Sequence, residues 1–335
     1  MIDTELPSPR FAVHGSALEL HCGVDALRPH IARFLAPFTV PGWPEGFYPI
    51  YGSIQPFDDA AVQRSISTSA VPLAAADELI ELYQDGDRFW LVDDRWGMAE
   101  LNLVKRQWRS WLLPRPSVDA LRCVEMSVLW PLAQLLRCKG LHLIPAVSIA
   151  RQGWGCLILC PFGIEPELKL LMRNGYRIIG QRWTILREED GRIAMLNMPG
   201  VVDAMTVPEL RALGRHADRS NDLLDLTLEF PGSGLNHAFC DSVIVVEPGR
   251  RTRAQLRPLS GTSTMLRLRR SWPIVDLQPA RQANQLPPKL ARLCQCAEVQ
   301  LCRDPSALLP LLDKLRRDVT SPVQLSLYVQ RRVAV

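Results

Sequence analysis

Apolar and polar positions alternate over short runs in the first part of the chain, a pattern typical of β-strands. Residues 17–20 (ALEL) show this alternation, and residues 38–52 (FTVPGWPEGFYPIYG) are rich in proline, glycine and aromatic side chains. From Asp87, the stretch DRFWLVDDRWGMAELNLVKRQWRSWLL predicts two or three strands with turns around Asp93-Asp94 and Gly97. The pattern predicts a β-rich region over residues 1–116, in which the paired aspartates are turn residues rather than catalytic carboxylates.

A helical pattern replaces the alternation after two prolines. Apolar residues recur at helical spacing over residues 118–140 (VDALRCVEMSVLWPLAQLLRCKG), with Ser117 as the N-cap and Gly140 as the stop. Pro131 is expected to kink this helix, because proline removes a backbone donor. Near the end of the chain, residues 286–315 predict amphipathic helices around PSALLPLLDKL.

The middle of the chain carries the clearest local signals. A strand is predicted over residues 141–150, a second strand over 154–160, and a helix from Glu167 to Arg173 that ends at Asn174-Gly175. The next segments predict strands over 176–179 and 183–186 and a turn at Glu189-Asp190-Gly191. A hairpin followed by a loop, a helix and a strand is the order found in mixed α/β phosphate-binding cores.

Composition and charge narrow the class of protein. A chain of 335 residues, 47% of them hydrophobic, is long enough for one large or two ordinary globular domains. The 39 Lys and Arg are spread among 35 Asp and Glu, which leaves a net charge of only +4. Nucleic-acid binding requires basic residues concentrated on one face of the protein. The even spread of basic and acidic residues therefore argues against a nucleic-acid partner.

The hydropathy pattern and the cysteines indicate the cellular compartment and whether a metal site is expected. No apolar run resembles a signal sequence or a membrane span, so we expect a cytoplasmic protein without a membrane partner. Nine cysteines at irregular spacing do not form a disulfide framework. Cys294, Cys296 and Cys302 cluster, but a zinc site would need more ligands at tighter spacing. We therefore predict reduced thiols and no metal or other cofactor.

Residues 141–186 (LHLIPAVSIARQGWGCLILCPFGIEPELKLLMRNGYRIIGQRWTIL) resemble the core of HPr kinase/phosphorylase and of related bacterial kinases found with peptide-modification genes. In that family a strand beginning with His precedes a hairpin, a Walker A loop, a helix and a strand that ends in an acidic pair. The resemblance extends over roughly residues 118–200. It implies a mixed α+β fold in which a P-loop kinase-like α/β domain over 117–335 follows the β-rich region 1–116. It also implies self-association.

The loop of this chain departs from the family's phosphate-binding loop. Lysine there contacts the outer phosphates and a hydroxyl holds magnesium, yet no Lys, Ser or Thr lies between Cys160 and Leu168. Laid on the family loop, Cys160 replaces the first glycine, Gly163 is kept, Glu165 replaces the last glycine, Pro166 replaces the lysine and Glu167 replaces the Ser or Thr. The alignment indicates a degenerate nucleotide loop.

The metal side of the family's site is changed as well. By spacing from Gly175, Gln181 and Arg182 stand where the acidic pair would be. A guanidinium neither binds a cation nor acts as a base near neutral pH. Arg182 is expected either to pair with Glu165 or Glu167, so that protein charges occupy the vacated site, or to point into water together with both glutamates. His142 is the one remaining match to a catalytic position, and a His in an apolar strand is also an ordinary core residue.

These losses predict a degenerate, pseudokinase-like protein that is not an enzyme and that binds or regulates a protein or peptide partner. One alternative is an atypical ATP-dependent serine kinase/phosphorylase that recruits other groups, with His142, Asp203, Glu209 and Arg211 as candidates. A second alternative is a nucleic-acid or small-ligand binding module. The turn at 160–167 also has a purely structural interpretation, in which proline and glutamate simply suit the first turn of a helix.

Overall fold

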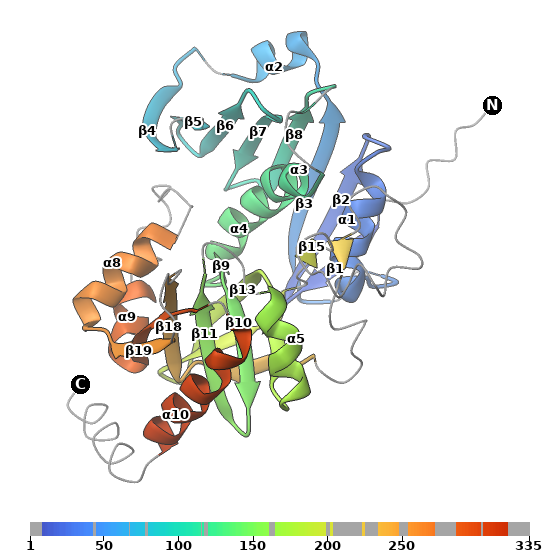
Figure 1. Ribbon diagram of the computed structural model, residues 1–335. Helices are drawn as coiled ribbons and strands as arrows, with labels where there is room; N and C mark the ends of the chain where they lie inside the picture. The colour runs from blue at the N-terminus through green and yellow to red at the C-terminus, as the bar shows by residue number, and fades with distance from the viewer. Residues whose placement is uncertain are drawn as a thin grey trace. The chain divides into compact units, whose positions relative to one another are not determined.

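The computed structural model of the protein has a mixed α+β fold with several sheets (Figure 1). It describes residues 9–42, 45–66, 68–77, 80–114, 116, 120–160, 165–198, 202–203, 223–224, 234–247, 254–271, 286–302 and 304–320. These residues form two compact units, of which the first ends at Leu141 and the second begins at His142. The boundary predicted at 116/117 falls inside the first unit.

The first unit is built on an eight-stranded mixed sheet in the order β1-β2-β3-β8-β7-β6-β5-β4. Strands β2, β3 and β8 run parallel, and the remaining neighbours are antiparallel. All eight strands of this sheet lie within residues 10–112. The strands are β1 (Arg10–Val13), β2 (Ser16–Cys22), β3 (Tyr48–Pro56), β4 (Val71–Asp77), β5 (Ile80–Asp85), β6 (Arg88–Asp93), β7 (Gly97–Asn102) and β8 (Gln107–Leu112).

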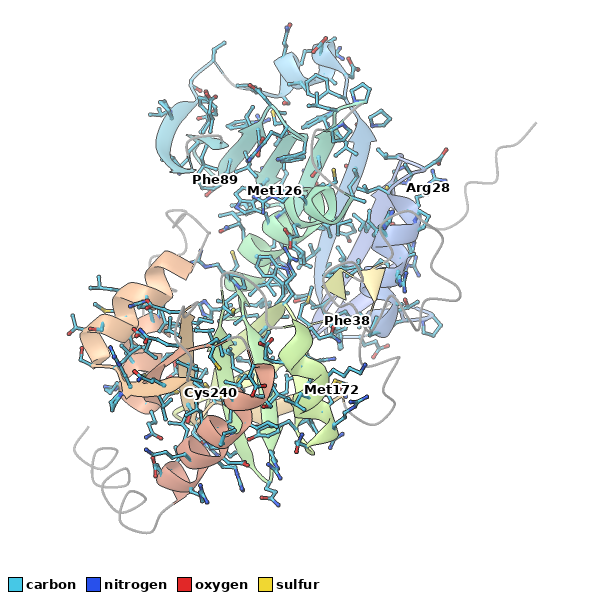
Figure 2. The ribbon with its side chains drawn as sticks, viewed as in Figure 1. Arg28, Phe38, Phe89, Met126, Met172 and Cys240 are labelled. Atoms are coloured by element: carbon cyan, nitrogen blue, oxygen red, sulfur yellow. The ribbon has the colours of Figure 1, made fainter. Side chains whose placement is uncertain are left out.

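Helices cover this sheet on both faces. One face is covered by the helical segment over residues 120–137. Phe89 of β6 and Met126 of this segment are both buried, and Figure 2 labels both. On the other face, α2 packs over Trp90, Met98 and Trp111. The helices of this unit are α1 (Arg28–Leu35), η1 (Ala36–Phe38), α2 (Asp59–Ser65), α3 (Ala120–Val124), the π-helical turn η2 (Glu125–Leu129) and α4 (Trp130–Arg137).

The helix predicted over 118–140 contains a π-helical turn, Glu125–Leu129, directly before α4, in which Pro131 is the second residue. Proline has no N–H to donate to the carbonyl four residues earlier, which here belongs to Ser127. That carbonyl accepts hydrogen bonds from Trp108 Nε1 and Ser110 Oγ of β8, both at 2.9 Å. The irregular turn thus frees a buried backbone oxygen that ties the helix to the sheet.

Asp93, interpreted above as a turn residue, ends β6 as a buried carboxylate. Its Oδ1 accepts from the backbone N–H of Arg95 at 2.9 Å, and its Oδ2 lies 2.6 Å from the Arg95 guanidinium. Burial alone would raise the pKa of Asp93, but the hydrogen bonds from Arg95 outweigh it and lower the pKa. The carboxylate therefore stabilises the turn in its ionised form.

We expect Asp93→Asn to lower the free energy of unfolding by about 1 kcal/mol at neutral pH, because the amide still accepts the backbone hydrogen bond but loses the charge. A lowered pKa gives a contribution that is complete above the ordinary carboxyl pKa and disappears as the pH falls through the folded value. Urea unfolding of both proteins should show a constant difference from neutral pH down to about pH 5, and a shrinking one below about pH 4. A difference that grows in acid would contradict this assignment.

The second unit contains a six-stranded sheet in the order β12-β10-β11-β18-β20-β19, a four-stranded sheet in the order β17-β14-β13-β9 and a two-stranded sheet of β15 and β16. Strands β11, β18 and β20 are parallel to one another. The strands are β9 (His142–Pro145), β10 (Val147–Arg151), β11 (Trp154–Leu159), β12 (Arg177–Gly180), β13 (Trp183–Glu189), β14 (Arg192–Leu196), β15 (Val202–Asp203), β16 (Leu223–Leu224), β17 (His237–Phe239), β18 (Ser242–Glu247), β19 (Gln255–Pro258) and β20 (Gln295–Gln300).

The six-stranded sheet is covered on both faces. Ile158 and Ile244 point to the face on which α5 and α10 pack, and Leu157 and Val243 point to the face of α8, α9 and the four-stranded sheet. Figure 1 shows α5 and α10 on the same side of β10 and β11. The helices are α5 (Glu165–Arg173), α8 (Gly261–Ser271), α9 (Leu286–Leu293), η5 (Pro305–Ala307) and α10 (Leu308–Thr320). No helix within the described ranges has the length and apolar character needed to cross a membrane.

A polar contact fixes α10 against the sheet. Asp313 Oδ1 accepts from Arg151 of β10 at 2.9 Å and from the Tyr176 hydroxyl at 3.1 Å. Burial, followed by the nearby Asp313 carboxylate, raises the pKa of Tyr176 to about 12. The phenol therefore stays a hydrogen-bond donor throughout the physiological range.

Most predicted elements of this unit are confirmed, but one predicted strand is divided into two and one strand was not predicted. Residues 141–150 form two strands in different sheets, because the chain changes sheet at Ala146 after a proline that cannot donate to a ladder. The stretch 286–315, predicted as helical, contains the buried strand β20 between α9 and α10. The six residues of β20, QCAEVQ, mix polar and apolar side chains without a clear period, so the sequence alone does not mark them as a strand.

Candidate functional site

The carboxyl end of β11 lies at a point where the chain leaves the sheet in two directions. β11 and β18 are neighbouring parallel strands, with Leu159 level with Val245. The chain after β11 enters α5 on one face, whereas the chain after β18 leads to α8 and α9 on the other. In α/β proteins this divergence opens a crevice outside the strand ends, where ligands bind. The edge beside Leu159 is therefore the candidate site.

The degenerate loop predicted from the sequence leads into α5 at this edge. Cys160 is half-buried and packs against the core beneath α5 and α10. The helix begins at Glu165, two residues earlier than predicted, so Pro166 lies in the first turn, where its missing N–H costs no helical hydrogen bond. Glu167 is half-buried, and Gly163 lies outside the described residues.

The end of β12 reaches the same edge of the sheet. Gly180 and Leu157 are both level with Ser148 of the intervening strand β10. Gln181 and Arg182 therefore lie near the end of β11, roughly 10 Å away across two strand spacings. Gln181 is buried, whereas Arg182 is exposed. The pairing of Arg182 with Glu165 or Glu167 stays a prediction. Because Arg182 is exposed, such an ion pair would contribute under about 1 kcal/mol to the free energy of unfolding.

The other sequence candidates lie further back in the fold, in another sheet or outside the described residues. His142 is buried at the start of β9, level with Leu186, while the far end of that strand pairs with Trp183 next to the edge. The three residue steps along β9 therefore separate His142 from this edge by roughly 10 Å. Asp203 lies in the two-stranded sheet with β16. Glu209 and Arg211 fall outside the described residues.

Three charged residues at this edge were not identified from the sequence. Glu247 is the last residue of β18, one position beyond Val246, which lies level with Cys160 by the register of β11 and β18. Arg267 of α8 forms an ion pair with Glu247, and its second nitrogen lies 3.0 Å from Glu298 of β20. One cation is thus held between two carboxylates, of which Glu298 is the more buried.

The signal for Glu247 is present in the sequence. SVIVVE is a continuous apolar run that ends in a carboxylate, and such runs are typical of parallel strands buried on both faces. The run does not reveal which strand lies beside it. Its neighbour β11 ends more than eighty residues earlier, so only the fold places Glu247 next to the loop.

Two of the three clustered cysteines are core residues. Cys294 and Cys296 are buried, and Cys302 is half-buried. Burial raises the pKa of Cys296 to about 11, so it is a thiol at neutral pH. Across the described part of the chain, no three His, Cys, Asp or Glu side chains group as metal ligands would.

Comparison of the sequence and the structure with those of known proteins finds little similarity. No family model matches the chain, and no curated protein matches it either. A solved structure, the Hpr(Ser) kinase/phosphatase from Coxiella burnetii, aligns over 54% of this chain and 99% of that one, with 11% identity and a TM-score of 0.33. A likeness of this size establishes neither the fold nor the family.

Proposed function

We propose that the chain is a non-catalytic protein of the HPr kinase type, in which a degenerate P-loop core binds or regulates a protein or peptide partner. The observation that carries the proposal is the absence of Lys, Ser and Thr between Cys160 and Leu168, at the strand-to-helix turn where a nucleotide would need them. Cys160 and Glu167 flank that turn instead.

The charges near the turn support the same conclusion. Glu247 adds a carboxylate on the adjacent strand, about one strand spacing from the end of β11. Arg267 already pairs with Glu247 and Glu298, so its charge is largely neutralised. Two like charges about 4 Å apart repel by about 4 kcal/mol at an effective dielectric of about 20. Phosphates at this edge would therefore meet repulsion without the usual lysine.

One observation favours the alternative of an atypical ATP-dependent enzyme. An acidic residue at the end of the strand beside the loop holds magnesium in P-loop proteins, and Glu247 occupies such a position. Catalysis would then require Glu247 to leave Arg267 and bind a metal. The two functions differ in whether nucleotide binding depends on magnesium and on Glu247.

A thermal-shift assay separates them. We expect about 1 mM ATP, with or without magnesium, to raise the melting temperature by less than about 2 °C, because a Kd weaker than about 1 mM contributes under about 0.5 kcal/mol. A ligand at about a hundred times its Kd would instead contribute about 2.7 kcal/mol and shift the midpoint by several degrees. Glu247→Gln serves as the matched variant.

A magnesium-dependent shift of several degrees that Glu247→Gln abolishes would overturn the proposal and support the atypical enzyme. A shift that needs neither magnesium nor Glu247 would point to a non-catalytic nucleotide sensor, which also contradicts the absence of nucleotide binding. Sedimentation over a range of concentrations tests the self-association that the family resemblance implies, independently of nucleotide.

A further inference from the structure

A polar hollow of about 180 Å³ lies on the eight-stranded sheet of the first unit, whereas the proposed function concerns the second unit. Strands β3, β8 and β7 line it side by side. The side chains on its surface form two rows across these strands. One row is Ser53, Arg109 and Glu100, and the other is Tyr51, Gln107 and Asn102.

The hollow exists because α2 covers only part of this sheet face. The apolar side chains Trp90, Met98 and Trp111 lie beneath α2 and are buried. The neighbouring positions on the same face carry hydroxyl, amide and charged groups and remain accessible, with Tyr51 47% exposed. A sheet face that changes from apolar to polar where its helical cover stops is suited to a polar ligand.

The charges of the hollow do not cancel. Glu100 is paired with Arg88, whose nitrogens lie 3.1 and 2.6 Å from Glu100 Oε1. Arg109 forms no ion pair with any residue that the structure describes; its guanidinium lies 5.6 Å from the centre of the Trp111 ring. Of the two charged residues that line the hollow, Glu100 is therefore paired with Arg88, and Arg109 is left as the positive charge without an ion pair among the described residues.

We propose that this hollow binds a carboxylate, held by the Arg109 guanidinium with help from Ser53 and Gln107. A guanidinium matches a carboxylate in shape and charge, and the hydroxyl and amide groups supply further donors. One surplus positive charge suits a monoanion better than a phosphate, which carries nearly two negative charges near neutral pH. The volume admits a group of the size of a glutamate side chain.

The carboxylate has two sources, a side chain of an acidic peptide or a free small acid, and two probes distinguish them. The probes are acetyl-Gly-Glu-Gly-Glu-Gly-amide and glutarate, each titrated into the full-length protein while tryptophan fluorescence and the Trp111 indole resonance are followed. The glutamine version of the peptide is the matched probe without charge. Saturable binding of the peptide or of glutarate, but not of the glutamine peptide, is expected.

Arg109→Gln should weaken this binding at least about tenfold, as expected for losing one charge-assisted hydrogen bond. Lys105→Gln is the matched control, because Lys105 is exposed on the same β7–β8 hairpin but does not line the hollow. The Lys105→Gln protein should bind the acidic probes with an affinity within about twofold of the wild type.

Equal affinity of Arg109→Gln and the wild type for the acidic probes would overturn the proposal. Equal binding of the glutamine peptide, or no saturable binding of either acidic probe, would overturn it too. Because this hollow and the edge of β11 belong to different units, the nucleotide assay is independent of this result.

Discussion

Gly155→Ala is expected to lower the free energy of unfolding by about 3 kcal/mol, the largest effect of any single substitution proposed for this protein. Gly155 lies on β11, where the six-stranded sheet approaches β17 of the four-stranded sheet. A Cβ atom at this position would stand 2.0 Å from the carbonyl oxygen of Phe239 and 2.8 Å from Met195 Cε. The methionine end can move, but the carbonyl oxygen is backbone, so β17 would have to shift.

The backbone of Gly155 also holds the turn between β17 and β18. Its N–H donates to Asp241 Oδ2 at 3.0 Å, and its carbonyl accepts from the Asp241 N–H at 2.9 Å. A displaced β17 would strain both hydrogen bonds, which adds to the cost of overpacking. The same displacement would disturb the start of β18 at Ser242, the end of the strand opposite to Glu247.

Urea unfolding followed by far-UV circular dichroism measures the effect. Gly261→Ala is the matched control, since the nearest atom to a Cβ at Gly261 is the carbonyl oxygen of Ala291 at an ordinary 3.7 Å. This control should change the stability by no more than about 0.5 to 1 kcal/mol, in the stabilising direction. Equal midpoints for the two variants would show that the sheets do not approach each other at Gly155.

Arg267→Met is expected to cost about 2 kcal/mol, the second largest effect. The substitution leaves the Glu298 side chain, only 11% exposed, without its cation and facing Glu247. Removing one partner of a buried pair costs roughly 3 to 5 kcal/mol, and the value is reduced here because Arg267 and Glu247 are each about one-third exposed. The remaining carboxylates repel each other at the edge of the sheet.

The double variant Arg267→Met/Glu298→Met tests the cause. Replacing both partners removes the unpaired charge, so the stability should return to within about 1 kcal/mol of the wild type. Arg257→Gln is the matched control, because Arg257 is an exposed residue opposite Glu298 that bonds to Gln255 instead. A double variant as unstable as Arg267→Met would show that Arg267 acts by packing of its side chain rather than by charge.

The sequence by itself determined the local elements that have strong periodicity and turn chemistry. The apolar run at 154–159, the helix that ends near Asn174-Gly175, and the turn at Asp190-Gly191 all occur where the pattern predicts them. The N–H that Pro131 lacks is a property of one residue, and it leaves the carbonyl of Ser127 without its helical donor. The absence of Lys, Ser and Thr from the loop is equally a fact of the sequence, independent of any alignment.

The tertiary structure decided which of these elements became neighbours. β11 pairs with β18 and β18 with β20 across long stretches of chain, and this pairing places Glu247 beside the loop and Arg267 between two carboxylates. The carbonyl freed by Pro131 finds Trp108 and Ser110 on another element. Periodicity depends on residues within a few positions of one another, whereas strand pairing and ion pairs depend on residues distant along the chain. The local pattern therefore predicts elements and lost chemical groups, but not the edge at which those elements meet.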